Sequence, residues 1–482
     1  MILNIIPKPN SVELLPGESW LEDLERVYEQ NDFYPDEYYR LEINDKKLLI
    51  ASKGEQGRFY AEKTLEQMSQ MGKLPHCIIT DLPEFSYRGF MIDSARHMQT
   101  VDEIKKYIEA AALYKFNVFH WHLCDDQGWR IESEKYPLLN EKGSWRSCHG
   151  FGSKNMEKYG GYYTKAEIRD IIEFCKERFI EVIPEIDMPG HTTAVVSTFP
   201  ELSCRGVQIP LETTGGIFKN ILCAGKEEVY DFCFNILDEV MELFPSDYIH
   251  IGGDEAPKAR WCNCPECQKK IKENNLKNEE ELQGYFVNRI IAYLKEKGKT
   301  ALCWNESLNS GILDSSAIIC DWMDPKHLSE NYANNGGKII IEDFYHYYLD
   351  YPYGMTPLKK TYKYNPYLEK LTFKGKRNVL GVETPIWTEY IEDFEKLSYM
   401  CFPRMIAVAE RGWTSTKNAD YKSFVVRLKN QRELLEKIGI NMAADECWDP
   451  TVDVRIKDQL GRLKTVLSPE SVKTFLFPNK DD

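Results

Sequence analysis

The sequence has no apolar run of eighteen residues, which is about the length that a helix needs to cross a bilayer. It also has no low-complexity segment. The sequence has fewer basic than acidic residues, with 61 Lys and Arg against 76 Asp and Glu, which gives a formal net charge of −15. This balance disfavours nucleic acid and anionic membranes as partners and favours a neutral substrate.

The first ten residues, MILNIIPKPN, lack the basic region, long apolar stretch and small-residue cleavage site of a secretory signal. We therefore expect the protein to remain in the cytoplasm. Its 14 cysteines are scattered through the chain without the density of a disulfide scaffold, which favours reduced thiols.

After residue 84, short β-type runs that end in polar residues alternate with long helix-type runs. With 482 residues and 43% hydrophobic content, the chain is long enough for a large α/β barrel and a small companion domain. The alternation therefore predicts a (β/α)8 TIM barrel. Its eight strand candidates are Tyr87–Asp93, Asn117–Cys124, Glu181–Ile186, Tyr248–Gly252, Thr300–Trp304, Ala317–Trp322, Lys338–Ile341 and Val379–Glu383.

The helix candidates between these runs carry start signals. Thr100 with Glu103 and Thr164 with Glu167 each form a capping-box pattern before apolar residues at helical spacing. Further helices are expected at Glu227–Leu243, Glu279–Glu296 and Phe394–Ala409.

Three segments follow from this pattern. Residues 1–83 predict a small α+β domain, with an extended run at Tyr39–Ile50, a helix near Gln56–Met71 and Pro83 near the junction. Residues 84–415 form the barrel. Residues 416–482 contain a helix near Tyr421–Ile438 and a tail that we expect to pack on the barrel.

Chemistry in such a barrel belongs at the carboxyl ends of the strands, and those ends are rich in polar and aromatic residues. A structural protein has little use for many carboxylates on one face, because each costs free energy to desolvate. Carboxylates, a histidine and tryptophans around one mouth favour a carbohydrate site. The strand-end residues include Asp93, His120, His122, Asp126, Glu185, Asp187, Asn305, Glu306 and Asp321, besides those given roles below.

Six motifs in order carry a resemblance to a known family. They are RHMQTVDEIKKYIEAAALYKFNVFHWHLCDDQGWRIESEKYP, IPEIDMPGH, YIHIGGDEAP, CWNES, YYLD and PIWTEY. Together they resemble the family 20 glycoside hydrolases, the β-N-acetylhexosaminidases, over nearly all of residues 84 to 413. The small N-terminal domain also resembles the one that precedes the barrel in that family.

The resemblance implies an exo-acting retaining enzyme that removes terminal N-acetylhexosamine by substrate-assisted catalysis. In this mechanism the 2-acetamido oxygen attacks the anomeric carbon of its own sugar. Glu255 would be the general acid and then the base, and Asp254 would orient the acetamido N–H and stabilise the oxazolinium charge.

The resemblance also implies roles for other residues. Tyr348 would donate its hydroxyl to the acetamido oxygen, with Tyr345 and Tyr347 as rival candidates. Trp304, Trp322 and Trp387 would surround the acetamido methyl group. Arg96, Asp350 and Glu389 would hold the hydroxyls of the non-reducing sugar, and Asp125 with His191 would support the acid.

Other interpretations stay open at this point. Asp254 and Glu255 also suit a helix start, and His120 and His122 suit structural hydrogen bonding. The whole barrel could be a catalytically silent sugar-binding protein, or a relative that releases a disaccharide. No cofactor is expected, and the sequence leaves the oligomeric state undetermined.

Cys262, Cys264 and Cys267 form a CxCxxC cluster just after the proposed acid. Such a cluster can bind zinc, but a tetrahedral site needs a fourth ligand and none is evident nearby. Reduced thiols without a metal are therefore the favoured interpretation.

Overall fold

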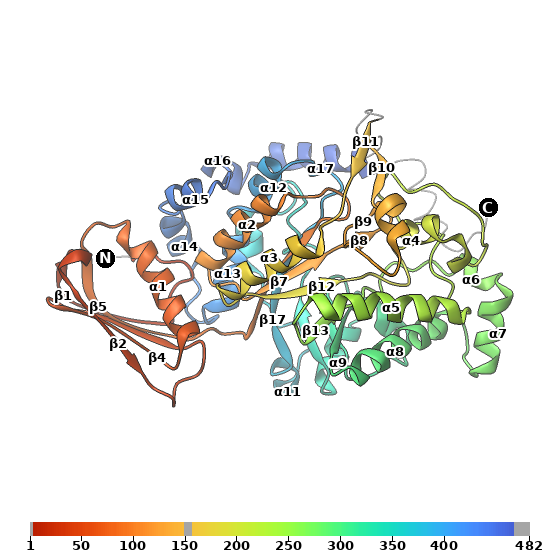
Figure 1. Cartoon of the computed structure of the whole chain (residues 1–482). Helices are drawn as coiled ribbons and strands as arrows, with labels where there is room; N and C mark the ends of the chain where they lie inside the picture. The colour runs from red at the N-terminus through yellow and green to blue at the C-terminus, as the bar shows by residue number, and fades with distance from the viewer. Residues whose placement is uncertain (1–2, 149–156, 467–482) are drawn as a thin grey trace.

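The computed structural model describes residues 3–148 and 157–466, and its N-terminal part is a small sheet covered by one helix (Figure 1). The sheet order is β1-β5-β3-β4-β2, and α1 (Glu55–Ser69) packs against it. The expected run at Tyr39–Ile50 is a hairpin rather than one strand, because the Asn44 side chain accepts from the backbone N–H of Lys46 and Lys47 and turns the chain. The strands are β1 (Ser11–Ser19), β2 (Glu25–Gln30), β3 (Tyr39–Ile43), β4 (Lys47–Ser52) and β5 (Leu74–Asp81).

A closed parallel barrel follows, which confirms the predicted (β/α)8 fold with its small α+β companion. The strands pair in chain order and the ring closes where β17 lies beside β6. All eight predicted strands are present, with ends shifted by a few residues at most. They are β6 (Tyr87–Asp93), β7 (Val118–His122), β12 (Glu181–Glu185), β13 (Tyr248–His250), β14 (Thr300–Trp304), β15 (Ile318–Asp321), β16 (Lys338–Ile341) and β17 (Val379–Ile386).

Most predicted helices are confirmed, and both capping boxes are formed. Thr100 caps α2 (Val101–Leu113) and Thr164 caps α3 (Lys165–Lys176). The bounds of α5 (Glu227–Leu243) and α8 (Glu279–Glu296) are those expected. The run predicted as one helix from Phe394 is split into α12 (Phe394–Cys401) and α13 (Arg404–Trp413), because Pro403 has no backbone N–H to continue it.

The C-terminal segment also differs from its prediction. The helix expected at Tyr421–Ile438 is two helices, α14 (Tyr421–Leu428) and α15 (Arg432–Ile438). They are followed by α16 (Asp445–Trp448) and α17 (Val452–Val466), while residues 467–482 lie outside the described residues. No helix within the described ranges combines the length and apolar character needed to cross a membrane.

The barrel interior is polar beneath its carboxyl end. His120 Nδ1 lies 2.6 Å from Glu383, and its Nε2 lies 3.2 Å from Glu185. His122 bonds to Glu185 and lies 2.8 Å from Asp125. Two residues apart on β7, both histidines face inward, and their contacts agree with a structural role. Through Asp125 this network reaches the carboxyl end of the barrel.

Candidate active site

A cavity of about 150 Å³ opens where the barrel strands end. Ten of the eleven predicted site residues line it, namely Arg96, Asp125, His191, Asp254, Glu255, Trp322, Tyr348, Asp350, Trp387 and Glu389. They come from segments spread over almost 300 positions of the sequence, and the closed barrel brings them together.

The turn after β13 aims two adjacent carboxylates into this cavity. Gly252 and Gly253 have left-handed φ values of 68° and 100°, and Glu255 follows at 42°, a rare conformation for a residue with a side chain. A Cβ on Gly252 would lie 1.6 Å from Asp187 Oδ1, so only glycine fits there. The turn therefore overcomes the usual tendency of neighbouring side chains to point apart.

Asp254 is a buried carboxylate with an open hydrogen-bonding position. Its Oδ1 has no hydrogen-bond partner among the described residues, and its Oδ2 lies 3.9 Å from His191 Nε2. Burial, followed by the nearby Asp187, raises the pKa of Asp254 well above its usual range. Buried polar atoms are rarely left unpaired in proteins, so Oδ1 is available to accept from a ligand.

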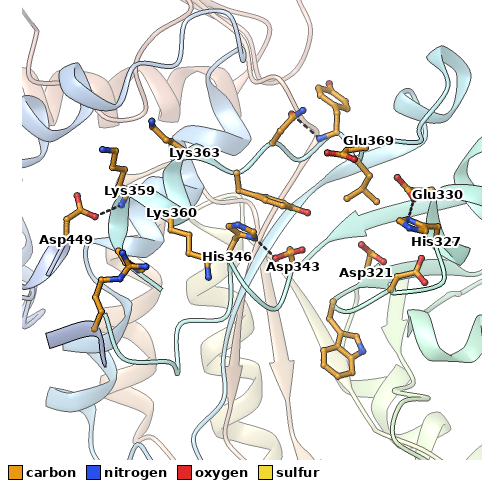
Figure 2. Close-up of a pocket in the computed structure, with 18 of the residues that line it drawn as sticks. Asp321, His327, Glu330, Asp343, His346, Lys359, Lys360, Lys363, Glu369 and Asp449 are labelled. Carbon is orange, nitrogen blue, oxygen red and sulfur yellow. Dashed lines mark hydrogen bonds and ion pairs between the residues drawn. The ribbon is translucent and has the colours of Figure 1, made fainter. Parts of the chain in front are cut away.

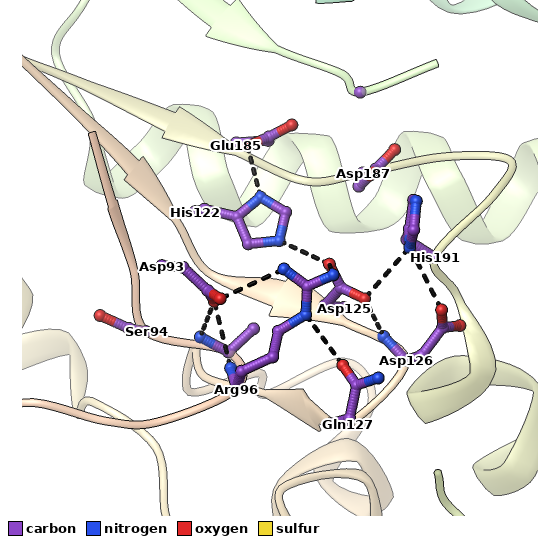
Figure 3. Close-up of polar contacts among 12 residues, drawn as sticks. Asp93, Ser94, Arg96, His122, Asp125, Asp126, Gln127, Glu185, Asp187 and His191 are labelled. Atoms are coloured by element: carbon purple, nitrogen blue, oxygen red, sulfur yellow. Dashed lines mark hydrogen bonds and ion pairs between the residues drawn. The ribbon is translucent and has the colours of Figure 1, made fainter. Parts of the chain in front are cut away.

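His191 lies between Glu255 and two buried aspartates, and Figure 3 shows its contacts with Asp125 and Asp126. Its Nδ1 lies 3.2 Å from both Asp125 and Asp126, and its Nε2 lies 3.5 Å from Glu255. Burial opposes the imidazolium charge, but Asp125 and the hydrogen bonds to the carboxylates outweigh burial and raise the pKa of His191 well above its usual range. Next to Glu255, an imidazolium at His191 can donate a proton, and the neutral imidazole can take one back.

Arg96 is held in place by carboxylates before any ligand arrives. Figure 3 shows its guanidinium between Asp93 and Asp125, at 3.1 and 2.7 Å. Gln127 accepts from its Nε at 2.9 Å, and Glu389 lies 3.9 Å away. This fixed geometry suits recognition of sugar hydroxyls at little cost in side-chain entropy.

Aromatic rings form one wall of the cavity. The Tyr348 ring centroid lies 6.1 Å from that of Trp322 and 6.2 Å from that of Trp387. Trp304 is the one predicted site residue that does not line the cavity, and its ring centroid lies 6.0 Å from that of Trp387. Its indole donates to Glu185 at 2.8 Å, which anchors it in the polar barrel interior.

The structure distinguishes among the three tyrosines. Tyr348 lines the cavity. Tyr345 is 56% exposed, whereas Tyr347 is fully buried against Tyr364. Tyr348 is therefore the one positioned to reach a ligand in this cavity.

Four further residues line the cavity and were given no site role from the sequence, namely Asp187, Phe344, Tyr351 and Arg462. Asp187 belongs to the IPEIDMPGH motif, so its position at a strand end was a usable signal. Arg462, on α17, lies in no motif that could have predicted its place. Its guanidinium lies 3.3 Å from Asp350. The C-terminal helix therefore contributes directly to the cavity.

Asp350→Asn should stabilise the protein increasingly as the pH rises. Burial raises the pKa of Asp350 to about 7, although Arg462 opposes the shift. A raised carboxyl pKa favours the folded state below the unfolded pKa of about 3.9, and this contribution is lost as the pH rises through about 7. Asparagine has no carboxyl group to ionise, so the variant does not undergo this loss. Its advantage in free energy of unfolding therefore grows over this pH window to at most about 4 kcal/mol.

Thermal unfolding of both proteins between pH 4 and pH 8 measures this difference. The exposed Asp231→Asn variant on α5 is the control and should show a difference that does not change with pH. A constant offset for Asp350→Asn across this range would contradict the prediction.

Figure 2 shows a larger cavity, of about 810 Å³. It shares Trp322 with the candidate site. Several of its ionisable groups pair with one another, since His346 lies 2.6 Å from Asp343 and His327 lies 2.5 Å from Glu330. It lacks the adjacent carboxylates at a strand end that the smaller cavity has. We therefore assign the chemistry to the smaller cavity.

A closed parallel barrel with a small cavity of carboxylates, a histidine and tryptophans at its carboxyl end is the arrangement expected of a glycoside hydrolase. The chain belongs to glycosyl hydrolase family 20, as the sequence resemblance predicted. The model of that family's catalytic domain matches residues 85–416, and the model of its domain 2 matches residues 22–82.

Individual relatives agree with this membership. A β-hexosaminidase of Porphyromonas gingivalis is 39% identical over 84% of this chain, which spans only 54% of that relative. A β-hexosaminidase of Akkermansia muciniphila is 33% identical, with 93% of each chain covered. The structure of a family 20 exo-β-N-acetylglucosaminidase from Vibrio harveyi, in complex with N-acetylglucosamine, matches with a TM-score of 0.82 and 29% identity over 92% of this chain and 78% of that one.

Proposed function

We propose that this protein is an exo-acting retaining β-N-acetylhexosaminidase that releases terminal β-linked N-acetylglucosamine or N-acetylgalactosamine from oligosaccharides or glycoconjugates. The observation that carries this proposal is the pair formed by Asp254 and Glu255, adjacent in the chain and both directed into one small cavity. Asp254 has an open acceptor, and the Glu255 carboxyl lies 3.5 Å from His191 Nε2.

In the proposed mechanism, Glu255 protonates the leaving glycosidic oxygen. The acetamido oxygen of the bound sugar attacks the anomeric carbon as the glycosidic bond breaks, which gives an oxazolinium ion. Glu255, now a carboxylate, removes a proton from water, and the water opens the ring with net retention of configuration. The His191–Asp125 pair supports Glu255 by supplying positive charge beside its carboxylate.

Asp254 and Tyr348 orient the acetamido group. The acetamido N–H donates to Asp254 Oδ1, which has no protein partner among the described residues. A donor arriving there favours the charged form and so reverses part of the pKa rise caused by burial. The resulting carboxylate stabilises the positive charge of the oxazolinium ion, while the Tyr348 hydroxyl donates to the acetamido oxygen.

The size of the cavity supports removal of one sugar at a time. Its volume of about 150 Å³ is below the roughly 300–1,000 Å³ of pockets for drug-sized ligands. Arg96, Asp350 and Glu389 would hold the hydroxyls of this terminal sugar. The complete set of acid, orienting carboxylate and tyrosine disfavours a silent sugar-binding barrel.

Hydrolysis of aryl N-acetyl-β-glucosaminide and N-acetyl-β-galactosaminide tests the proposal. We expect release of the aryl group from at least one of them, and none from the corresponding β-glucoside, which has no acetamido group to form the oxazolinium ion. Longer substrates should lose single sugars from the non-reducing end. Failure to cleave both N-acetyl substrates, or equal cleavage of the β-glucoside, would contradict the proposal.

A further inference from the structure

Four cysteines meet in a cluster that the proposed function does not use. The sulfur atoms of Cys204, Cys223, Cys264 and Cys267 all lie within 4.8 Å of one another. The Cys223 sulfur is 3.5 Å from that of Cys267 and 3.6 Å from that of Cys264, and the Cys204 sulfur is 3.9 Å from that of Cys267. Four sulfurs bound at about 2.3 Å to one tetrahedral Zn²⁺ lie about 3.8 Å apart, so the spacing fits this metal.

Two separate segments of the chain build the cluster. Cys204 and Cys223 flank a β-bridge between Ser203 and Leu222, and the Cys223 backbone N–H donates to Leu202 at 2.9 Å. Cys264 and Cys267 come from the start of α7 (Pro265–Glu273). The segments approach closely at Gly225, where a Cβ would lie 2.3 Å from the backbone nitrogen of Cys267.

The ligand set is not the one suggested by the CxCxxC spacing. Cys262 is exposed and lies outside the cluster, whereas Cys223, Cys264 and Cys267 are buried. The fold supplies Cys204 and Cys223 from about 40 to 60 positions earlier in the sequence. The motif therefore supplies two of the four ligands, and the fold brings the other two from outside it.

Metal-free thiols do not explain the arrangement well. Other compact groups of potential ligands among the described residues, such as His120, Glu185 and His250, place basic side chains next to acidic ones. Thiols are only weak donors and acceptors, so four of them gain little from one another. Soft thiolate ligands favour zinc, and a four-sulfur site has no open position for catalysis.

We propose that Cys204, Cys223, Cys264 and Cys267 bind one structural Zn²⁺ as thiolates. Binding releases the thiol protons, and the four bonds tie the segment after β12 to the segment after β13. His191 belongs to the first segment, and Asp254 with Glu255 belong to the second. The metal would fix the position of Glu255 relative to His191 without contacting substrate.

Metal analysis of the full chain, purified without a polyhistidine tag from zinc-replete medium, tests the proposal without relying on activity. We expect one zinc per chain in the wild type and in Cys262→Ser, the matched control beside the cluster. Cys223→Ser should lose the zinc and unfold at a lower temperature. X-ray absorption of the wild type should show four sulfur neighbours of zinc at about 2.3 Å. This measurement tests the four-cysteine site even if Cys223→Ser does not fold.

Alkylation of the denatured wild type without reductant provides the second readout. All 14 cysteines should react if zinc holds thiolates. Substoichiometric zinc in the wild type, iron in its place, disulfides within the cluster, or full zinc retention by Cys223→Ser would each overturn the proposal.

Discussion

Glu255→Gln should lower kcat/KM for an aryl N-acetyl-β-glucosaminide by about 10²–10⁴, the usual contribution of a general acid or base. The amide keeps the shape of the side chain but cannot donate a proton to the leaving oxygen or accept one from water. The loss should be smaller for an activated leaving group such as dinitrophenolate, which departs without protonation. Steady-state kinetics with a series of leaving groups measures this dependence.

Azide separates this role from structural damage. As an anionic nucleophile it needs no base, so it should accelerate the second step in Glu255→Gln and give the β-glycosyl azide. The exposed Glu273→Gln variant on α7 is the control and should match the wild type. An equal loss for all leaving groups, with no azide product, would remove Glu255 from the acid and base role.

Asp254→Asn should lower kcat/KM by about 10²–10³, the range for loss of one preorganised electrostatic group. Asparagine still offers an oxygen to the acetamido N–H, but it brings no negative charge to the oxazolinium ion. The midpoint of thermal unfolding should stay the same or rise, because burial already opposes the charge of Asp254. Kinetics and calorimetry on the same preparation measure both effects.

A thiazoline analogue of the oxazolinium ion provides the mechanistic readout. It should inhibit the wild type strongly, and its affinity should fall in Asp254→Asn by a factor similar to the loss in kcat/KM. The exposed Asp231→Asn variant is again the control. Unchanged inhibitor affinity in Asp254→Asn would place the acetamido group away from this carboxylate.

The fold was largely predictable because its signals are local. Each barrel strand is a short apolar run with a polar end, and each of the two capping boxes fixes a helix start within four residues. The differences also have local causes. Pro403 divides one predicted helix, and Asn44 turns one predicted strand into a hairpin.

The site was predictable only as far as ordered motifs extend. Asp254, Glu255 and Tyr348 lie within them, and the structure brings all three to one cavity. Trp304 lies in a motif too, but its indole donates to Glu185 in the barrel interior, a direction that depends on packing. Arg462 bonds to Asp350, which lies 112 positions away in the sequence, and no local pattern predicts this contact.

The sequence by itself determined the class of fold, the family and the residue types available for chemistry, because strand periodicity, helix caps and motifs are short-range properties of the chain. Only the tertiary structure decided which side chains meet. It left the Asp254 oxygen open, added Arg462 to the cavity, excluded Cys262 from the thiol cluster and brought in Cys204 and Cys223. These outcomes depend on contacts between segments far apart in sequence, where closure of the barrel, rather than any local preference, sets the distances.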